Sequence, residues 1–97
     1  MSSGSGEYVR SLILARLEQP MVEMGLEPAA ITDDFDLLTS GIVDSLGVVE
    51  LIGAIEQQLG IALDLSELDP ESLTTVGPLS RYIETQYLQS VHARRSA

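Results

Sequence analysis

Asp44 and Ser45 stand at the start of an aliphatic segment that runs to Gly60, and they are the residues best placed to do chemistry. Aspartate and serine are typical of the first residues of a helix, so Ser45 is expected at a helix N-terminus with an accessible hydroxyl. The first N–H groups of a helix lack intrahelical partners and the helix dipole is positive there, so a phosphate is favoured at this position. We interpret Ser45 as an attachment point for a phosphate-bearing group and not as a catalytic residue.

The segment after Ser45 has two faces on a helical wheel of about 100° per residue. One arc carries aliphatic residues that we expect in the core: Val48, Leu51, Ile52, Ile55 and Leu59. On or near the opposite arc lie the residues that we expect to face solvent or a partner, with Glu56 at the flank: Leu46, Val49, Glu50, Gly53 and Gln57. Leu46 and Val49 would be apolar side chains facing water one turn apart, which indicates a docking patch for another protein.

The sequence around Ser45 resembles the acyl and peptidyl carrier protein family. The resemblance rests on Gly41-Ile42-Val43-Asp44-Ser45-Leu46, then Val49-Glu50-Leu51 and a helix ending at Leu59-Gly60-Ile61, and it extends from about Leu12 to about Leu88. In that family, the serine of an Asp-Ser-Leu motif carries phosphopantetheine. The resemblance therefore implies that Ser45 is the attachment site and that Asp44 belongs to the motif. It also implies a partner-binding face formed by Leu46, Val49, Glu50, Gly53 and Glu56.

The resemblance implies a carrier without enzymatic activity. A phosphopantetheinyl transferase would move the group from coenzyme A to Ser45, and loading enzymes and downstream synthases or transferases would use the arm. The arm would hold acyl or aminoacyl intermediates as thioesters in fatty acid, polyketide, peptide or aminoacyl pathways. The alternative is an acidic helical protein-interaction module in which Ser45 is only a helix N-cap. A serine nucleophile is disfavoured, because it needs an adjacent base and the one histidine, His92, lies near the C-terminus.

Two residues, Ile42 and Val43, separate Gly41 from Asp44, where the family commonly has one. The longer form resembles discrete carriers for amino acids, such as the D-alanyl carriers, and also some stand-alone polyketide and peptide carriers. It favours a free-standing carrier, although a domain excised from a multienzyme would look the same.

Composition excludes several classes of function. Fifteen acidic residues against five basic ones give a net charge of −10, so nucleic acid is disfavoured and basic protein surfaces are favoured as partners. The chain has no cysteine, which excludes disulfides and thiolate metal sites, and we expect a cytoplasmic monomer. No apolar run approaches the roughly 20 residues that span a bilayer. The acidic run from Asp33 to Asp36 lacks EF-hand spacing, so no metal site is expected.

These patterns predict an all-α fold, a small four-helix bundle of three main helices and one short one. The first helix is expected over 7–19, where Pro20 ends or kinks it, with a further turn closed by Gly25. A long loop over 25–43 should cover one end of the core through its apolar residues: Leu26, Ile31, Phe35, Leu37 and Leu38.

The second half of the chain completes the bundle. After an extended connection over 61–68, Asp69 and Pro70 indicate the start of a short helix. Thr75 is then expected to cap a last helix whose buried stripe is Val76, Leu79, Ile83 and Tyr87. We divide the chain into a flexible leader over 1–6, a carrier domain over 7–89 and a flexible tail over 90–97.

Overall fold

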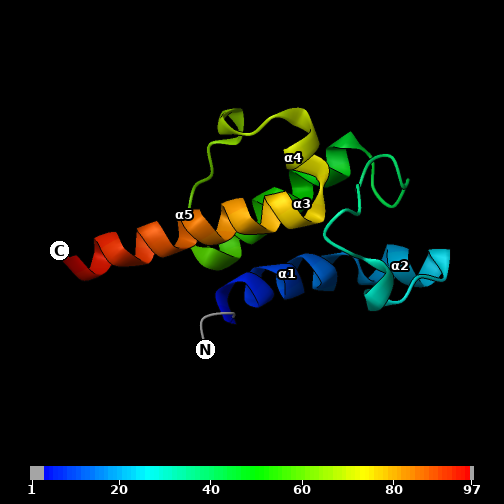
Figure 1. The fold of residues 1–97 in the computed structure, drawn as a ribbon, viewed down its shortest axis with the longest axis horizontal. Helices are drawn as coiled ribbons and strands as arrows, with labels where there is room; N and C mark the ends of the chain where they lie inside the picture. Colours follow the sequence, from blue (N-terminus) through cyan, green and yellow to red (C-terminus); the bar gives the residue numbers. More distant parts are fainter. Residues whose placement is uncertain (1–3, 97) are drawn as a thin grey trace.

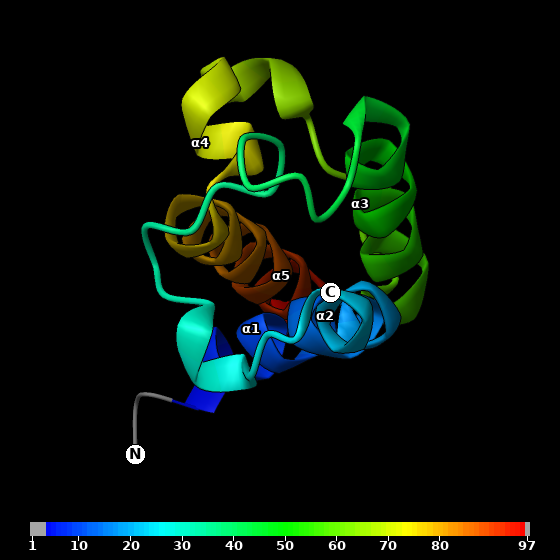
Figure 2. The ribbon, with the colours of Figure 1, turned by 90° about the vertical axis from the view of Figure 1, so that its right-hand side faces the viewer.

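The computed structural model describes residues 4–96, and the side chains of residues 7–93. Its helices are α1 (Gly4–Arg16), α2 (Glu18–Met24), α3 (Ser45–Leu59), α4 (Pro70–Thr74) and α5 (Val76–Ser96), with short 3-10 turns η1 (Pro28–Ala30) and η2 (Leu65–Glu67). No strand occurs over residues 4–96, which confirms the all-α prediction. Helices α1 and α5 lie side by side along the long axis, α3 crosses behind them, and α4 lies over the start of α5 (Figures 1 and 2).

The predicted first helix is two helices, and the break falls at Leu17, three residues before Pro20. A proline ring clashes with the carbonyl four residues earlier in a continuous helix, so the chain breaks ahead of the proline. Leu17 has φ −98° and ψ 2°, and Pro20 then lies in the first turn of α2, where its missing N–H needs no partner. Gly25 ends α2 in the left-handed region at φ 73°, as predicted.

The core is aliphatic and fills the space between α1, α3, α5 and the loop over 25–44. All five residues that the wheel placed in the core of α3 are buried: Val48, Leu51, Ile52, Ile55 and Leu59. On α5, Val76, Leu79 and Ile83 are buried as predicted, whereas Tyr87 is partly buried. Burial of each such aliphatic side chain stabilises the fold by about 1.5 to 3 kcal/mol, so α3 is a principal anchor of the bundle.

The loop over 25–44 contributes to the core in a slightly different way from the prediction. Ile31 and Leu37 are fully buried, and Leu26 and Phe35 are partly buried against the core. The expectation for Leu38 was wrong, because its side chain is 36% exposed. Ile42, whose burial was not predicted, is buried, so the chain shortly before Ser45 is held by the core.

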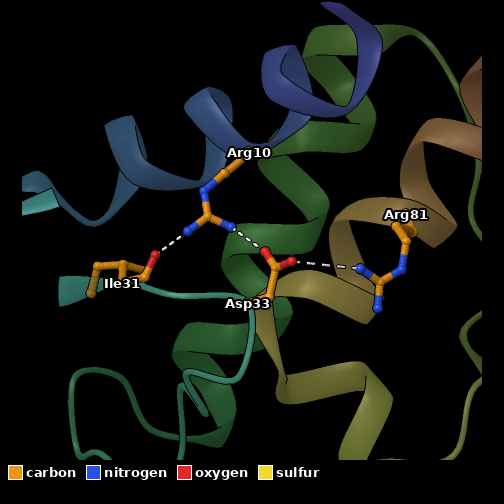
Figure 3. A network of polar contacts seen from close by, with 4 residues as sticks. All are labelled: Arg10, Ile31, Asp33 and Arg81. Carbon is orange, nitrogen blue, oxygen red and sulfur yellow. Dashed lines mark hydrogen bonds and ion pairs between the residues drawn. The ribbon is translucent and has the colours of Figure 1, made fainter. Parts of the chain in front are cut away.

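A set of polar contacts ties this loop to α1 and α5 (Figure 3). Arg10 donates to the carboxylate of Asp33 at 2.6 Å and to the carbonyl of Ile31, and a nitrogen of Arg81 lies 3.8 Å from Asp33. The backbone N–H of Gly77 donates to the Asp33 carbonyl at 2.9 Å. The loop therefore lies directly on the N-terminus of α5.

The connection from α3 to α5 begins its short helix as predicted. The Asp69 side chain caps α4 by accepting from the N–H of Ser72 at 2.7 Å, and Pro70 is the first helical residue. Thr75 immediately precedes α5, but its hydroxyl donates back to the Glu71 carbonyl at 2.6 Å and does not cap the helix. The predicted extended connection over 61–68 includes the turn η2.

The two ends of the chain were predicted to be flexible. Residues 1–3 of the leader and residue 97 of the tail lie outside the described residues. Residues 4–6 belong to α1, and α5 continues as a helix to Ser96, so the structure gives these parts regular conformation. The flexibility of either segment, and the domain limits drawn from it, stay a prediction.

Candidate functional site

Ser45 is the first residue of α3, and its side chain is exposed to solvent. The residue that caps the helix is Asp44, with extended backbone at φ −95° and ψ −176°, and its carboxylate accepts from the N–H of Gly47 at 2.7 Å. The Ser45 hydroxyl has no hydrogen-bond partner among residues 4–96. The interpretation in which Ser45 is only a helix N-cap is therefore wrong, because its neighbour caps α3 and leaves the hydroxyl available.

The first turn of α3 also leaves backbone donors unused. Of its early N–H groups, that of Gly47 is taken by the Asp44 carboxylate and that of Val48 by the Asp44 carbonyl at 3.0 Å. The N–H groups of Ser45 and Leu46 have no partner within the described part of the chain. Two unbonded donors and an exposed hydroxyl at the positive end of a helix suit a phosphate ester of that hydroxyl.

The chain just before Ser45 is fixed by local backbone contacts. Gly41 has φ 82°, a left-handed conformation that glycine adopts without strain. The N–H of Val43 then donates to the Leu37 carbonyl at 3.3 Å, and Ile42 is buried. This turn sets the direction in which the chain enters α3, and so where the Ser45 hydroxyl points.

A groove of about 430 Å³ lies beside Ser45, between the start of α3, α4 and the loop over 36–39. Apolar side chains supply much of its lining: Leu38, Val48, Val49 and Leu73. The exposure of Leu38 that the sequence did not predict has its explanation here, because Leu38 forms part of this wall and not of the core. Ser45 itself lines the groove, so the groove begins at the serine.

Asp36 organises one wall of this groove. Its carboxylate accepts from the N–H groups of Leu38 at 2.8 Å and Thr39 at 3.0 Å, and from the hydroxyl of Thr74 at 3.2 Å. The Thr39 N–H holds the pKa of Asp36 below its ordinary value of 3.8, against the opposing effect of burial. Sequence reasoning placed Asp36 only in an acidic run, and a signal for its role was available in its position two and three residues before Leu38 and Thr39, the spacing of an Asx turn.

The predicted partner-binding residues lie on the outer side of α3. Leu46 is 64% exposed and Val49 is 59% exposed, as the wheel predicted, and Glu50 is exposed beside them. Gly53 and Glu56 are partly buried, and the Glu56 carboxylate accepts from the N–H of Leu63 at 2.7 Å. The Glu56 carboxylate thus already has a structural role, holding the chain that follows α3, and the contact of this face with partners stays a prediction.

Other chemistries find little support in this part of the molecule. His92 belongs to the C-terminal part of α5, and Figure 1 shows the C-terminal end of this helix far from the start of α3. Over residues 4–96 no three His, Asp or Glu side chains are grouped as a metal site would require. None of the helices described is both long enough and apolar enough to cross a membrane.

Comparison with known proteins agrees with this geometry. Residues 21–83 match the family described as "Phosphopantetheine attachment site". An acyl carrier protein of Saccharopolyspora erythraea is 38% identical over 69 residues, which cover 70% of each chain. An acyl carrier protein of Wolinella succinogenes is 32% identical over 63 residues, covering 65% of this chain and 80% of that protein. No solved structure matches. The chain belongs to the acyl carrier protein family, whose members are not enzymes and bear a covalently attached phosphopantetheine group.

Proposed function

We propose that Ser45 is the residue to which phosphopantetheine is attached, and that the protein tethers acyl or aminoacyl intermediates there and presents them to partner enzymes. The proposal rests on one observation. Asp44, and not Ser45, caps α3, so the Ser45 hydroxyl is exposed and makes no hydrogen bond. When bound, the group supplies a thiol that carries the cargo as a thioester.

The residues around Ser45 provide the donors that a phosphodiester would need. The unbonded N–H groups of Ser45 and Leu46 and the dipole of the 15-residue helix α3 favour the negative charge. The Asp44 carboxylate opposes a second anion nearby, but it lies against Gly47 and leaves the other two donors available. The helix N-terminus therefore binds and orients the phosphate, and α3 supplies the rigid support.

The groove beside Ser45 supports a second part of the proposal, namely a shelter for the arm or its cargo. Leu38, Val48 and Leu73 offer it an apolar surface, which suits an acyl chain better than a charged one. The turn held by Asp36 fixes one wall, and α4 forms the opposite wall.

Partner enzymes are proposed to dock on the outer side of α3. Leu46 and Val49 are the apolar contacts, Glu50 adds negative charge, and Gly53 and Glu56 continue the surface. The partners we propose are a phosphopantetheinyl transferase, loading enzymes and downstream synthases or transferases. Fatty acid, polyketide, peptide and aminoacyl pathways are all compatible with this surface, and we retain the cytoplasm and a monomeric state as predictions.

The attachment residue is tested by intact mass. The protein is incubated with coenzyme A and a broad-specificity phosphopantetheinyl transferase, and a single phosphopantetheine adduct is expected. Ser45→Ala should give none, while the matched variant Ser40→Ala, a serine in the preceding loop, should be loaded like the wild type. Circular dichroism spectra of all three proteins establish that they are folded. An adduct that persists in Ser45→Ala, or a folded wild type that is never loaded, would contradict the proposal.

A further inference from the structure

A second apolar groove, of about 400 Å³, lies where α1, α2 and η1 meet. Its surface is mainly apolar, and the side chains that matter below are Leu14, Met21, Val22, Leu26 and Pro28. Of its polar residues, Ser11 already donates its hydroxyl to the Tyr8 carbonyl at 2.7 Å, and Glu18 lies at the edge. The groove shares no lining residue with the one beside Ser45.

The exposure of Val22 indicates that this groove is a binding surface. It is 73% exposed, the highest value among the exposed large hydrophobic side chains described, and Met24 on the same short helix is 46% exposed. Single exposed aliphatic residues are common, but an exposed valine on the wall of an apolar groove extends one continuous apolar surface. Met21 supplies the buried contact of α2, so the fold does not require an apolar residue at position 22.

The charged side chains around the groove are acidic, which favours a basic partner. Glu18 lines it, and Glu23 and Glu27 are exposed on the adjoining segment. The chain has no lysine, and two of its five arginines, Arg10 and Arg81, form ion pairs with Asp33. A third, Arg16, does not line this groove but a different pocket, together with Glu50. A second copy, itself at −10, would bring more negative charge to this acidic edge, whereas a basic partner would be attracted.

The groove lies away from the Ser45 end of the molecule. In Figure 2, α2 and the cyan turn η1 occupy the lower half of the view, and α4 and the start of α3 occupy the upper half. A partner bound at α2 would therefore leave Ser45 and the outer side of α3 accessible to another protein.

We infer that the groove formed by α1, α2 and η1 is a second docking site, which takes an amphipathic, arginine- or lysine-bearing helix of another protein. The partner places an aliphatic side chain against Val22 and Leu26, and its basic residues face Glu18 and Glu27. The inference goes beyond the carrier role, and it does not depend on Ser45 being modified.

The test uses the full-length protein and two synthetic helical peptides. Both have leucines along one face, and the opposite face carries arginines in the first peptide and glutamates in the second. Amide chemical shifts of the ¹⁵N-labelled protein are followed during titration. The arginine peptide should shift residues of α2 and η1, with an affinity that falls as salt is raised, and the glutamate peptide should not bind.

Matched variants locate the binding site. Val22→Asp should weaken the arginine peptide by about tenfold or more, and Val49→Asp, the same change at a similarly exposed valine beside Ser45, should change its affinity at α2 little. The double variant Glu18→Gln, Glu27→Gln should weaken binding and flatten its salt dependence. Loading of Ser45 in Val22→Asp, measured by intact mass, reports separately on the carrier role.

Three outcomes would overturn the inference. The first is that the glutamate peptide binds with the same affinity as the arginine peptide, which would show non-specific hydrophobic binding. The second is that Val49→Asp reduces the affinity of the arginine peptide at α2 and Val22→Asp leaves it unchanged. The third is a dimer in sedimentation that Val22→Asp disrupts, since the occupant would then be a second copy.

Discussion

Helices α3 and α5 begin in opposite ways. At α3 the cap comes from Asp44, its own neighbour, and the N–H groups of Ser45 and Leu46 stay unbonded. At α5 the N–H groups of Val76 and Gly77 donate to the carbonyls of Phe35 and Asp33, at 3.0 and 2.9 Å. Both N-termini are the positive ends of a helix dipole, so the two starts differ in their backbone donors: N–H groups remain available to an anion at α3, whereas those of Val76 and Gly77 are already bonded at α5.

The N-terminus of α5 is also packed tightly against the loop that covers it. A Cβ atom added to Gly77 would lie 2.8 Å from the Asp33 Cβ and 3.0 Å from the Asp33 carbonyl oxygen, which is backbone and cannot swing away. Gly77→Ala should therefore push the loop off α5. Overpacking costs about 1 to 3 kcal/mol, and alanine recovers up to about 1 kcal/mol in a helix, so we expect a net loss on the order of 1 kcal/mol in the free energy of unfolding.

Urea unfolding followed by circular dichroism measures that loss. Loading of Ser45 in Gly77→Ala should stay close to wild type, because the substitution lies at the closed end. A variant as stable as the wild type would show that the loop over 33–35 yields easily, and the contrast between the two helix starts would lose its structural basis.

At the open start of α3, the test removes the cap. Asp44→Ala loses the acceptor for the Gly47 N–H and should cost about 1 kcal/mol, whereas Asp44→Asn keeps an acceptor and should cost a few tenths at most. Thermal unfolding of the two variants measures the difference. If Asp44→Asn were as destabilised as Asp44→Ala, the charge of Asp44 and not its hydrogen bond would stabilise this end.

Sequence reasoning predicted the N-terminus of α3 and did not predict the contacts that close the N-terminus of α5. The faces of α3 were predicted correctly, down to the exposure of Leu46 and Val49, because helical periodicity is a local property of the chain. The contact of Asp33 with Gly77 joins residues far apart in sequence, and no local pattern announces it. A glycine two residues into a helix was the one available sign of close approach.

The remaining errors have similar physical causes. Pro20 was recognised as a helix breaker, but the break itself moved to Leu17 because the ring acts on the carbonyl four residues earlier. Leu38, which was expected in the core, is exposed, and Ile42, whose burial was not predicted, is buried, since loop side chains follow tertiary packing and not a period. The hydrogen bond from the Leu63 N–H to the Glu56 carboxylate was also not predicted, because it joins the helix to the chain that follows it, and the assignment of Glu56 to the partner surface stays a prediction.

A glycine in the middle of α3, Gly53, provides a smaller effect, a substitution that should stabilise the protein. Nothing lies within 4 Å of a Cβ atom added to Gly53, which is helical and faces outward. Gly53→Ala should stabilise the protein by about 0.5 to 1 kcal/mol, because alanine loses less backbone entropy in a helix than glycine does. Urea unfolding measures the gain, and the variant is the matched control for Gly77→Ala. A destabilised Gly53→Ala would mean that the outer side of α3 is more crowded than the structure shows.

The smallest effect concerns Asp36, which lies between the two helix starts and holds the loop to Thr74. Because the Thr39 N–H lowers the pKa of Asp36 in the folded protein, the unfolded chain binds the proton more readily. The stabilisation is then complete above the ordinary pKa of 3.8 and is lost as the pH falls through the lower, folded value. Asp69, whose pKa is lowered chiefly by the Ser72 N–H, acts in the same direction.

Asp36→Asn isolates the Asp36 part of this acid sensitivity. The variant should melt below the wild type at about pH 6, and the gap between the two midpoints should narrow as the pH falls below 3.8 and through the lower, folded pKa of Asp36, where the wild-type carboxylate is protonated as well. Asp34→Asn, at an exposed neighbour in the same loop, corrects for the change in net charge. A gap that stayed constant with pH would mean that the shape of the asparagine, and not the lost charge, destabilises the turn. The wall of the Ser45 groove would then depend on packing alone, and its geometry should be insensitive to acid.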